Sequence, residues 1–386
     1  MGNARAEILV DVAAIRHNVR LLKELTGTQM MTVVKADGYG HGLAETARAA
    51  REGGAEWLGV ATIDEALALR RSGDTGRVLC WLTVPGDDWA AAIEQDVDVT
   101  VYSETELDEV LATGLHARVQ VKVDTGLSRG GAPREAWQDL MARAADADKA
   151  GRIRVTGVWS HFSSSDEPDD PANDAQEKLF GEALDLATSA GLDLEVRHLA
   201  NSAAAILRPS SRLDLVRCGI ASYGLDPAPG VTPPLGLVPA MTARADLAMV
   251  KHIDAGTAVS YGRTWTAEHA TTVGLVPVGY ADGLPRVGGN RAEVGVGGRR
   301  RPVRGRICMD QLVVDLDGDD PGAGADALVF GPGTHGEPTA QDWAEACGTI
   351  SYEIVTRIGG RMRRRHVDSD PAPDPATDPG TEGGQR

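Results

Sequence analysis

The chain has 386 residues, of which 42% are hydrophobic, and this is enough for two domains of ordinary size. Its formal net charge of -17 disfavours non-specific binding to nucleic acid or to an anionic membrane surface. No apolar run approaches the length of a membrane span, the N-terminus lacks a signal-peptide core, and the 4 cysteines are far apart, so we expect a cytoplasmic protein with reduced thiols and no metal site.

The first predicted element is a strand at residues 7–12, EILVDV. From residue 30 onward, short β-branched runs alternate with amphipathic segments whose apolar residues recur at helical spacing. We expect strands at 30–35, 57–62, 77–82, 98–102, 118–123, 153–159, 194–199 and 213–217, and helices at 43–53, 63–73, 87–95, 104–113, 134–149 and 173–190. This alternation favours an α/β fold with an N-terminal parallel (β/α)8 barrel of the TIM type, and a doubly wound open sheet is the alternative.

The composition of the sequence changes near residue 225. The segment DPAPGVTPPLGLVPA is too rich in Pro and Gly for a long helix or a central strand. Residues 240–365 then carry short alternating runs broken by glycines, with helical periodicity only at about 339–358, which indicates a mostly-β domain. We therefore divide the chain into an N-terminal strand at 1–12 that pairs with the C-terminal β domain, a barrel at 13–235, the β-rich domain at 236–367, and a disordered acidic, Pro-rich tail at 368–386.

Chemically capable residues follow the predicted barrel strands at their carboxyl ends, where the active sites of such barrels form. Singly, each has an ordinary structural explanation: Lys35 could be a loop lysine, Asn201 could cap a helix, and Arg217 could pair with Asp214. Together they share one rim, and this indicates a site. The residues are Lys35 and Tyr39 after the first barrel strand, Lys122, Asp124 and Arg129 after the fifth, His161 after the sixth, His198, Asn201 and Ser202 after the seventh, and Arg217, Gly219 and Ile220 at the eighth.

The composition of this rim indicates a cofactor. Lys35 lies in TVVKADGYGHG, where a β-favouring run ends in a lysine surrounded by glycines. A lysine can form an imine with an aldehyde, and the last two loops of such barrels often bind phosphate through backbone N–H groups. An amine, a phosphate cradle and an arginine directed at the same space together point to pyridoxal 5'-phosphate.

Eight segments closely resemble the motifs of the alanine racemase family. They are VVKADGYGHG, KVDTGLSRGG, HLANSAA, VRCGIASYGL, VSYGRTW, PVGYADG, RICMDQ and SYEI, in that order over roughly residues 6–365. The resemblance implies a pyridoxal-phosphate-dependent isomerase that interconverts L-alanine and D-alanine with two bases and supplies D-alanine for bacterial peptidoglycan. It also implies a barrel and a β-rich domain assembled as a head-to-tail homodimer whose subunits share their active sites.

The resemblance further implies roles for single residues of this chain. Lys35 matches the cofactor-bearing lysine, and Tyr261 matches the second base, which comes from the partner subunit. The remaining matches are Tyr39, Ser202, Gly219, Ile220 and Tyr352 at the cofactor phosphate, Arg217 at its ring nitrogen with His161 and Asn201 nearby, Arg129 and the Met309 N–H at the substrate carboxylate, Lys122 as a lysine that can be carbamylated, Tyr280 at the entrance, and Asp310 as a supporting residue.

Two other functions remain as alternatives. A pyridoxal-phosphate-dependent amino-acid decarboxylase of the same fold type would carry a glycine triplet in the phosphate loop and a catalytic Cys-Asp pair. Here the loop reads RCGIASYG, and Cys308 is followed by Met309. A non-catalytic pyridoxal-phosphate-binding protein would be a single barrel, without the second domain that carries Tyr261.

Overall fold

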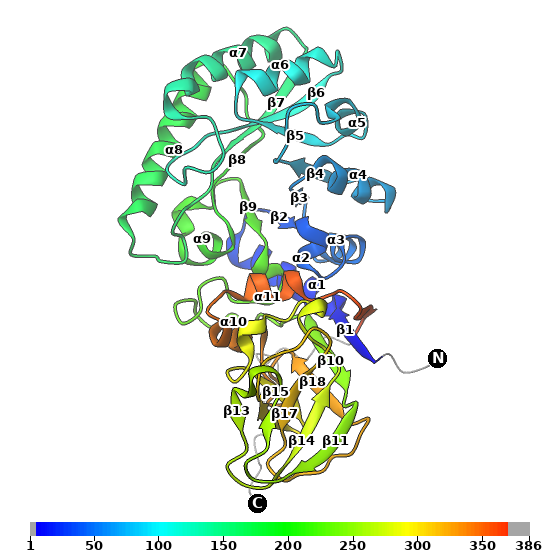
Figure 1. Cartoon of the computed structure of the whole chain (residues 1–386). Helices are drawn as coiled ribbons and strands as arrows, with labels where there is room; N and C mark the ends of the chain where they lie inside the picture. Colours follow the sequence, from blue (N-terminus) through cyan, green and yellow to red (C-terminus); the bar gives the residue numbers. More distant parts are fainter. Residues whose placement is uncertain (1–4, 370–386) are drawn as a thin grey trace, which may run out of the picture.

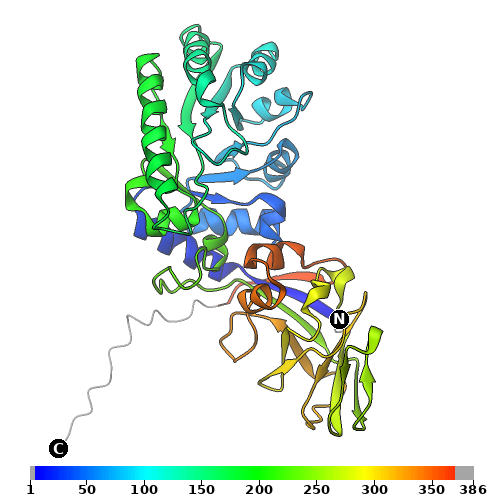
Figure 2. The ribbon, with the colours of Figure 1, turned by 60° about the vertical axis from the view of Figure 1, so that its left-hand side comes forward.

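The computed structural model describes residues 5–369, so nearly all of the predicted tail lies outside the described residues. The chain forms a barrel stacked end to end on a β domain (Figures 1 and 2). Among the described residues, none of the helices combines the length and the apolar character that crossing a membrane requires.

The barrel is an eight-stranded sheet in the order β8-β7-β6-β5-β4-β3-β2-β9, and its adjacent strands pair in parallel. Two backbone hydrogen bonds join β8 to β9 and close the ring, from Asp214 N–H to the Arg197 carbonyl at 3.2 Å and from Arg217 N–H to the Ala200 carbonyl at 3.0 Å. The strands are β2 Gln29–Val33, β3 Trp57–Val60, β4 Arg77–Cys80, β5 Asp98–Val101, β6 Ala117–Lys122, β7 Ile153–Trp159, β8 Val196–His198 and β9 Leu215–Cys218. The predicted parallel barrel is confirmed, and the open sheet is excluded.

Helices cover the outside of the barrel. They are α1 Val12–Thr26, α3 Leu43–Glu52, α4 Ile63–Arg71, α5 Trp89–Glu94, α6 Glu104–Ala112, α7 Trp137–Lys149, α8 Pro171–Ser189 and α9 Ser202–Leu207. Helix α1 was not predicted from the sequence, although both of its ends carry helix-capping residues. Asp11 accepts a hydrogen bond from Ala13 N–H at the start, and Gly27 ends the helix with a φ of 66°.

The β domain is built on a six-stranded sheet in the order β16-β15-β18-β10-β1-β19. The first strand of the chain, β1 Ala6–Asp11, pairs antiparallel with β10 and parallel with β19, so the N-terminus lies inside this domain. The other strands are β10 Met241–Asp246, β11 Met249–Ile253, β12 Ala258–Val259, β13 Trp265–Thr266, β14 Thr271–Val276, β15 Glu293–Val296, β16 Arg299–Pro302, β17 Leu312–Asp315, β18 Asp326–Phe330 and β19 Arg363–Val367, and the helices are α10 Ala340–Cys347 and α11 Ser351–Arg357. The basic run GGRRRPVRGR begins in the turn of the β15–β16 hairpin and continues through β16.

The two bodies meet beside the predicted lysine motif. Helix α11 of the β domain packs against α2 Lys35–Tyr39, a short turn that leaves the carboxyl end of β2 (Figure 1). Arg364 of β19 pairs with Asp37 at 2.6 Å, and His366 bonds the His41 carbonyl at 2.7 Å. The β domain therefore braces the segment that carries Lys35.

Candidate active site

A cavity of about 640 Å³ opens at the carboxyl ends of the barrel strands. Most of the site residues predicted from the sequence line it, although they come from distant parts of the chain. They are Lys35, Tyr39, Lys122, Arg129, His161, Asn201, Ser202, Arg217, Gly219, Ile220 and Tyr352.

Lys35 is placed by an unusual turn. Ala36, Asp37 and Tyr39 all have φ near 54°, in the left-handed region that residues other than glycine rarely adopt. The turn is held from outside, because Ala36 N–H donates to Glu65 Oε1 at 2.7 Å and Asp37 pairs with Arg364. Burial and, next, the charge of Arg129 lower the pKa of the Lys35 amine. A larger share of that amine is therefore neutral and nucleophilic than in an exposed lysine.

At the end of β9, the barrel strand next to β2, the chain lets the Tyr39 hydroxyl approach the backbone closely. A Cβ at position 219 would lie 2.4 Å from the Tyr39 hydroxyl oxygen, so glycine is required there by space. Ser202 Oγ accepts a hydrogen bond from Gly219 N–H at 2.9 Å, which ties the start of α9 to the end of β9. Asn201 caps α9, since its side-chain oxygen accepts from Ala204 N–H at 3.0 Å. The capping role considered for Asn201 is therefore observed, and Asn201 also faces the cavity.

Arg217 is buried at the wall of the cavity that it lines, and both terminal nitrogens of its guanidinium donate hydrogen bonds. Nη1 donates to His198 Nδ1 at 3.0 Å, and Nη2 donates to His161 Nδ1 at 3.0 Å. Nη2 also donates to the carbonyls of Ser160 at 2.8 Å and Leu199 at 3.0 Å. Burial lowers the pKa of Arg217 to about 9, which still leaves it charged at neutral pH.

The ion pair considered between Arg217 and Asp214 is not formed. Asp214 pairs instead with Arg197 at 2.6 Å, on the outer side of the barrel end. Arg217 lies over the face of Trp159 at 4.8 Å from the ring centroid, and the Lys122 ammonium lies 4.7 Å from the same ring. The aromatic ring thus provides part of the favourable environment for these cations.

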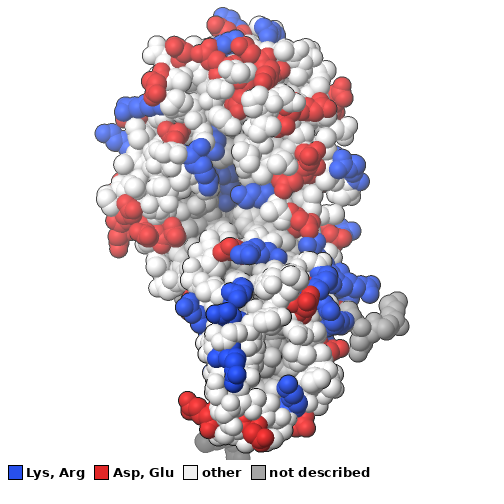
Figure 3. Space-filling view, viewed as in Figure 1, with Lys and Arg blue, Asp and Glu red and all other residues white. Residues whose placement is uncertain are grey.

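The cavity is strongly cationic. Its lining contains Lys35, Lys122, Arg129 and Arg217 but no Asp or Glu. Basic side chains gather in and around the hollow between the two bodies, although the whole chain is acidic (Figure 3). Burial, and next Arg217 and Arg129, lower the pKa of Lys122 to about 8. Such a cavity is suited to a ligand with more than one negative charge.

The histidine beside Arg217 is neutral. Burial and then the charges of Arg217, Arg129, Lys122 and Lys35 lower the pKa of His161 well below its usual value. Because Arg217 can only donate, His161 Nδ1 must accept and the proton of the neutral ring sits on Nε2. His161 therefore offers an N–H donor to whatever lies on its other side.

Four predicted site residues do not line the cavity of their own chain. Tyr261, Met309 and Tyr280 lie on the β domain, where they are 70%, 53% and 41% exposed. Asp310 is also exposed, and it pairs with Arg361 at 2.5 Å. A single chain therefore brings together the barrel residues of the predicted site but leaves these four on its surface.

The sequence analysis missed several aromatic residues of the cavity. Trp81 and Tyr102 directly follow the last residues of β4 and β5, and Trp159 ends β7. Lys35 was predicted because it is a polar residue at the carboxyl end of a strand. These aromatic residues were not predicted, because aromatic residues are commonly part of the core. The Lys35 ammonium lies 6.0 Å from the centroid of the Trp81 ring. The position of Trp81 directly after a strand is the sequence signal that would have identified it as a site residue.

Comparison with known proteins gives one consistent result. The family model of the alanine racemase N-terminal domain matches residues 10–227, and that of the C-terminal domain matches residues 240–366. An alanine racemase of Streptomyces coelicolor is 52% identical over 377 residues, which cover 95% of this chain and 96% of that protein. One of Salinispora arenicola is 49% identical over 371 residues, 95% of this chain and 99% of that protein. The crystal structure of alanine racemase from Streptomyces lavendulae superposes with a TM-score of 0.94 at 48% identity, covering 96% of this chain and 98% of that one. The likeness thus extends over both bodies of the fold.

Proposed function

The chain belongs to the alanine racemase family, and from this premise we propose how its own residues perform the reaction. It interconverts L-alanine and D-alanine with pyridoxal 5'-phosphate, and it provides D-alanine for cell-wall peptidoglycan. The proposal rests on the cavity, where the Lys35 amine, with its lowered pKa, lies together with three further cations. Among the described residues, no acidic side chain lines this cavity. A phosphate and an amino-acid carboxylate are the anions that such a cavity would hold.

The residues present fit pyridoxal 5'-phosphate. When bound, this cofactor supplies an electron sink that makes the Cα–H of the substrate acidic. Lys35 would hold it through its amine, and Arg217 would donate a hydrogen bond to its ring nitrogen. The phosphate would lie beside the Tyr39 hydroxyl, whose close approach to the backbone Gly219 permits, near Ser202, Ile220 and Tyr352.

Racemisation requires a proton to leave one face of Cα and another to arrive at the opposite face. We assign Lys35 Nζ to one face, since its lowered pKa leaves more of the amine neutral, and so able to take a proton, than in an exposed lysine. We assign the phenol oxygen of Tyr261 to the other face. Because Tyr261 is 70% exposed and lies outside the cavity of its own chain, it would reach the site only from a second copy. The proposal therefore includes a head-to-tail homodimer in which Tyr261 and Tyr280 of each chain enter the other's cavity.

The hydrogen bonds of His161 support this assignment. Its Nε2–H is the donor left over after Nδ1 accepts from Arg217. Directed at the phenol oxygen of Tyr261 from the partner subunit, it would stabilise the deprotonated form that a base requires. Arg217 and His161 would thus act together on the cofactor ring and on the second base.

Arg129 is the side chain placed to bind the substrate carboxylate, with the Met309 N–H of the partner subunit as a second donor and Asp310 beside it. Lys122 lies among cations rather than carboxylates, and its pKa of about 8 leaves part of it neutral near pH 7. A neutral amine can react with carbon dioxide, and the resulting carbamate would turn a cation beside Arg129 into an anion that orients it. We propose this modification on Lys122.

Circular dichroism tests the function directly. Purified protein with pyridoxal phosphate is expected to bring a solution of L-alanine, and separately of D-alanine, to zero ellipticity. Lys35→Ala should abolish this in both directions. Tyr261→Phe should abolish it while leaving the cofactor bound, and an active mixture of Lys35→Ala and Tyr261→Phe subunits would show that the site is shared. Release of carbon dioxide would identify a decarboxylase instead, and bound cofactor without turnover would identify a binding protein.

A further inference from the structure

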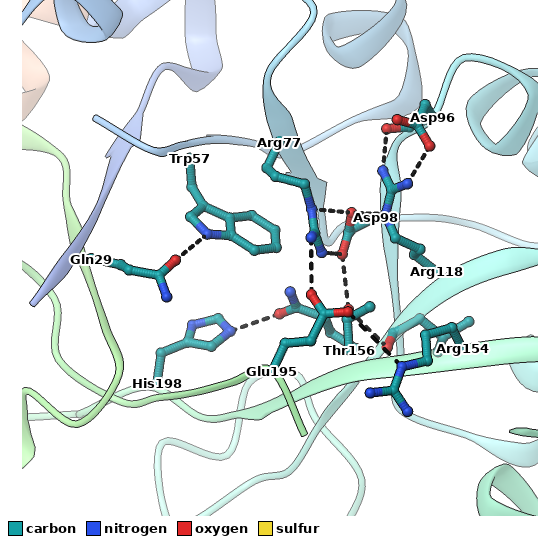
Figure 4. A network of polar contacts seen from close by, with 12 residues as sticks. Gln29, Trp57, Arg77, Asp96, Asp98, Arg118, Arg154, Thr156, Glu195 and His198 are labelled. Carbon is teal, nitrogen blue, oxygen red and sulfur yellow. Dashed lines mark hydrogen bonds and ion pairs between the residues drawn. The ribbon is translucent and has the colours of Figure 1, made fainter. Parts of the chain in front are cut away.

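A chain of buried hydrogen bonds runs from Arg217 toward the amino-end half of the barrel. Arg217 Nη1 donates to His198 Nδ1 at 3.0 Å, and His198 Nε2 lies 2.7 Å from Gln120 Oε1. Gln120 and His198 are 0% exposed, and Arg217 is 4% exposed. Figure 4 shows His198 hydrogen-bonded to the amide of a neighbouring side chain, beside the ion-paired network that contains Arg77 and Asp98.

The positions of the protons in this chain follow from Arg217 alone. A guanidinium has donors and no acceptor, so the His198 nitrogen that faces it must be bare. Burial, and next the charge of Arg217, lower the pKa of His198 well below its usual value, so the ring is neutral. Its one proton is then on Nε2, and the Gln120 atom that accepts it must be the amide oxygen.

We propose that Gln120 is a positioning residue for the racemase reaction: its amide oxygen holds His198 in the Nε2–H form and thereby aims the Arg217 guanidinium into the cofactor site. The inference rests on the proposed function, because it concerns the residue assigned to the cofactor's ring nitrogen. It concerns the orientation of Arg217, since Gln120 itself lies one layer below the cavity and is absent from its lining.

The surroundings of Gln120 show that the barrel accommodates its amide at a cost. Among the described residues, the Gln120 Nε2 group has no hydrogen-bond partner, and neither has Thr100 Oγ1, which stands at the paired position of the neighbouring strand β5. Room for the amide is made by Gly157, where a Cβ would approach Gln120 Cδ to 3.2 Å. Because an apolar residue would avoid the unpaired donor, the bond to His198 is the contact that accounts for an amide here.

The decisive variant is Gln120→Met, which keeps a long unbranched side chain and removes the acceptor. His198 Nε2–H is then buried without a partner, a loss that corresponds to roughly a tenfold change in an equilibrium. With histidine ring nitrogens labelled by 15N in the holoenzyme, the His198 signals, assigned by their loss in His198→Asn, should show bare Nδ1 and protonated Nε2 in the wild type. In Gln120→Met, a second tautomer should appear, the absorption band of the bound cofactor should shift, and kcat should fall about tenfold with little change in KM.

A matched control is available in the same barrel. Gln29 Oε1 accepts a hydrogen bond from Trp57 Nε1 at 3.0 Å, again from an aromatic ring N–H to a glutamine amide (Figure 4). Among the described residues, no hydrogen bond joins this pair to Arg217. Gln29→Met should leave the His198 signals, the cofactor band and kcat as in the wild type. Gln120→Glu retains an oxygen acceptor and should restore the wild-type tautomer and most of the lost kcat.

Several outcomes would overturn the inference. One is a wild-type spectrum with a protonated His198 Nδ1, which requires no variant. Another is a folded Gln120→Met enzyme with wild-type tautomer, cofactor band and kcat, and a third is a Gln120→Glu enzyme that behaves as the Met variant does. The predicted wild-type tautomer would support the inference even in a protein that failed to racemise alanine, a failure that would count only against the proposed function.

Discussion

The space beside Gly219 gives a quantitative test of the cofactor site. An added Cβ would lie 2.4 Å from the Tyr39 hydroxyl oxygen and 2.9 Å from Tyr39 Cζ. The backbone itself accepts alanine without strain from φ, because Gly219 has a φ of -100°. Ordinary contact begins near 3.4 Å, so the Tyr39 oxygen must move by about 1 Å. Tyr39 is 8% exposed and sits in the constrained turn after Lys35, so it has little freedom to do so.

A displacement of about 1 Å in a positioned group can reduce turnover by about 100-fold. We therefore expect Gly219→Ala to lower kcat by up to that factor and to weaken pyridoxal phosphate binding about tenfold, the effect of one disturbed hydrogen bond to a charged group. Reconstitution of the apoenzyme, followed by absorbance, measures the affinity, and circular dichroism measures racemisation. Adding Tyr39→Phe removes the closest atom but also the hydroxyl proposed to contact the phosphate, so this double variant should not regain the wild-type affinity.

Gly181 provides the control for this substitution. It lies within α8, and a Cβ there would meet nothing within 4 Å. Gly181→Ala should leave turnover unchanged and stabilise the protein by about 0.5–1 kcal/mol, because alanine favours a helix interior over glycine. Wild-type cofactor affinity and kcat in Gly219→Ala would refute the assignment of this space to the phosphate.

Three further predictions concern charge and protonation. Asp98→Asn should lower the free energy of unfolding by about 3 kcal/mol, because Asp98 is 0% exposed and pairs with Arg77 and Arg118 at 2.7 Å (Figure 4). It should not alter kcat, because this pair of contacts lies at the amino ends of the strands, away from the cavity. Urea unfolding measures the first effect, and turnover measures the second. Burial lowers the pKa of His41 to about 4, below its unfolded value of 6.5. Its contribution of about 3 kcal/mol to the free energy of unfolding is therefore present above pH 6.5 and is lost as the pH falls toward 4. The free energy of unfolding across this range should depend less on pH in His41→Gln. The carbamate on Lys122 should add about 44 Da, the mass of one carbon dioxide. Its occupancy in bicarbonate should rise through pH 8 as the neutral amine forms, and an unmodified native mass at pH 9 would contradict it.

The fold and the barrel half of the site were accessible from the sequence for one physical reason. Parallel strands of a closed barrel end at a single rim, so residues that follow separate strands, such as Lys35 and Arg217, must meet. The geometry of the lysine turn was not accessible, because its left-handed residues depend on Glu65 and Arg364, which are distant in sequence. The bond between His198 and Gln120 was hidden for the same reason, since it spans 78 positions and leaves no local pattern.

The charge of the cavity connects these findings. The chain carries 56 acidic residues against 39 basic ones, yet none of the acidic side chains at residues 5–369, the part that the structure describes, lines the cavity. Burial, and next the charge of Arg129 for Lys35 and of Arg217 for Lys122, lower the pKa of both amines, so a larger share of each is neutral and reactive than in an exposed lysine. Acidic neighbours would raise the pKa of these amines by stabilising the ammonium forms, and the amines would then be less reactive. In the proposed function, the anions that balance Arg129 and Arg217 would come with the cofactor phosphate, the substrate carboxylate and the carbamate proposed on Lys122, so a lining without acidic side chains would favour both ligand binding and amine chemistry.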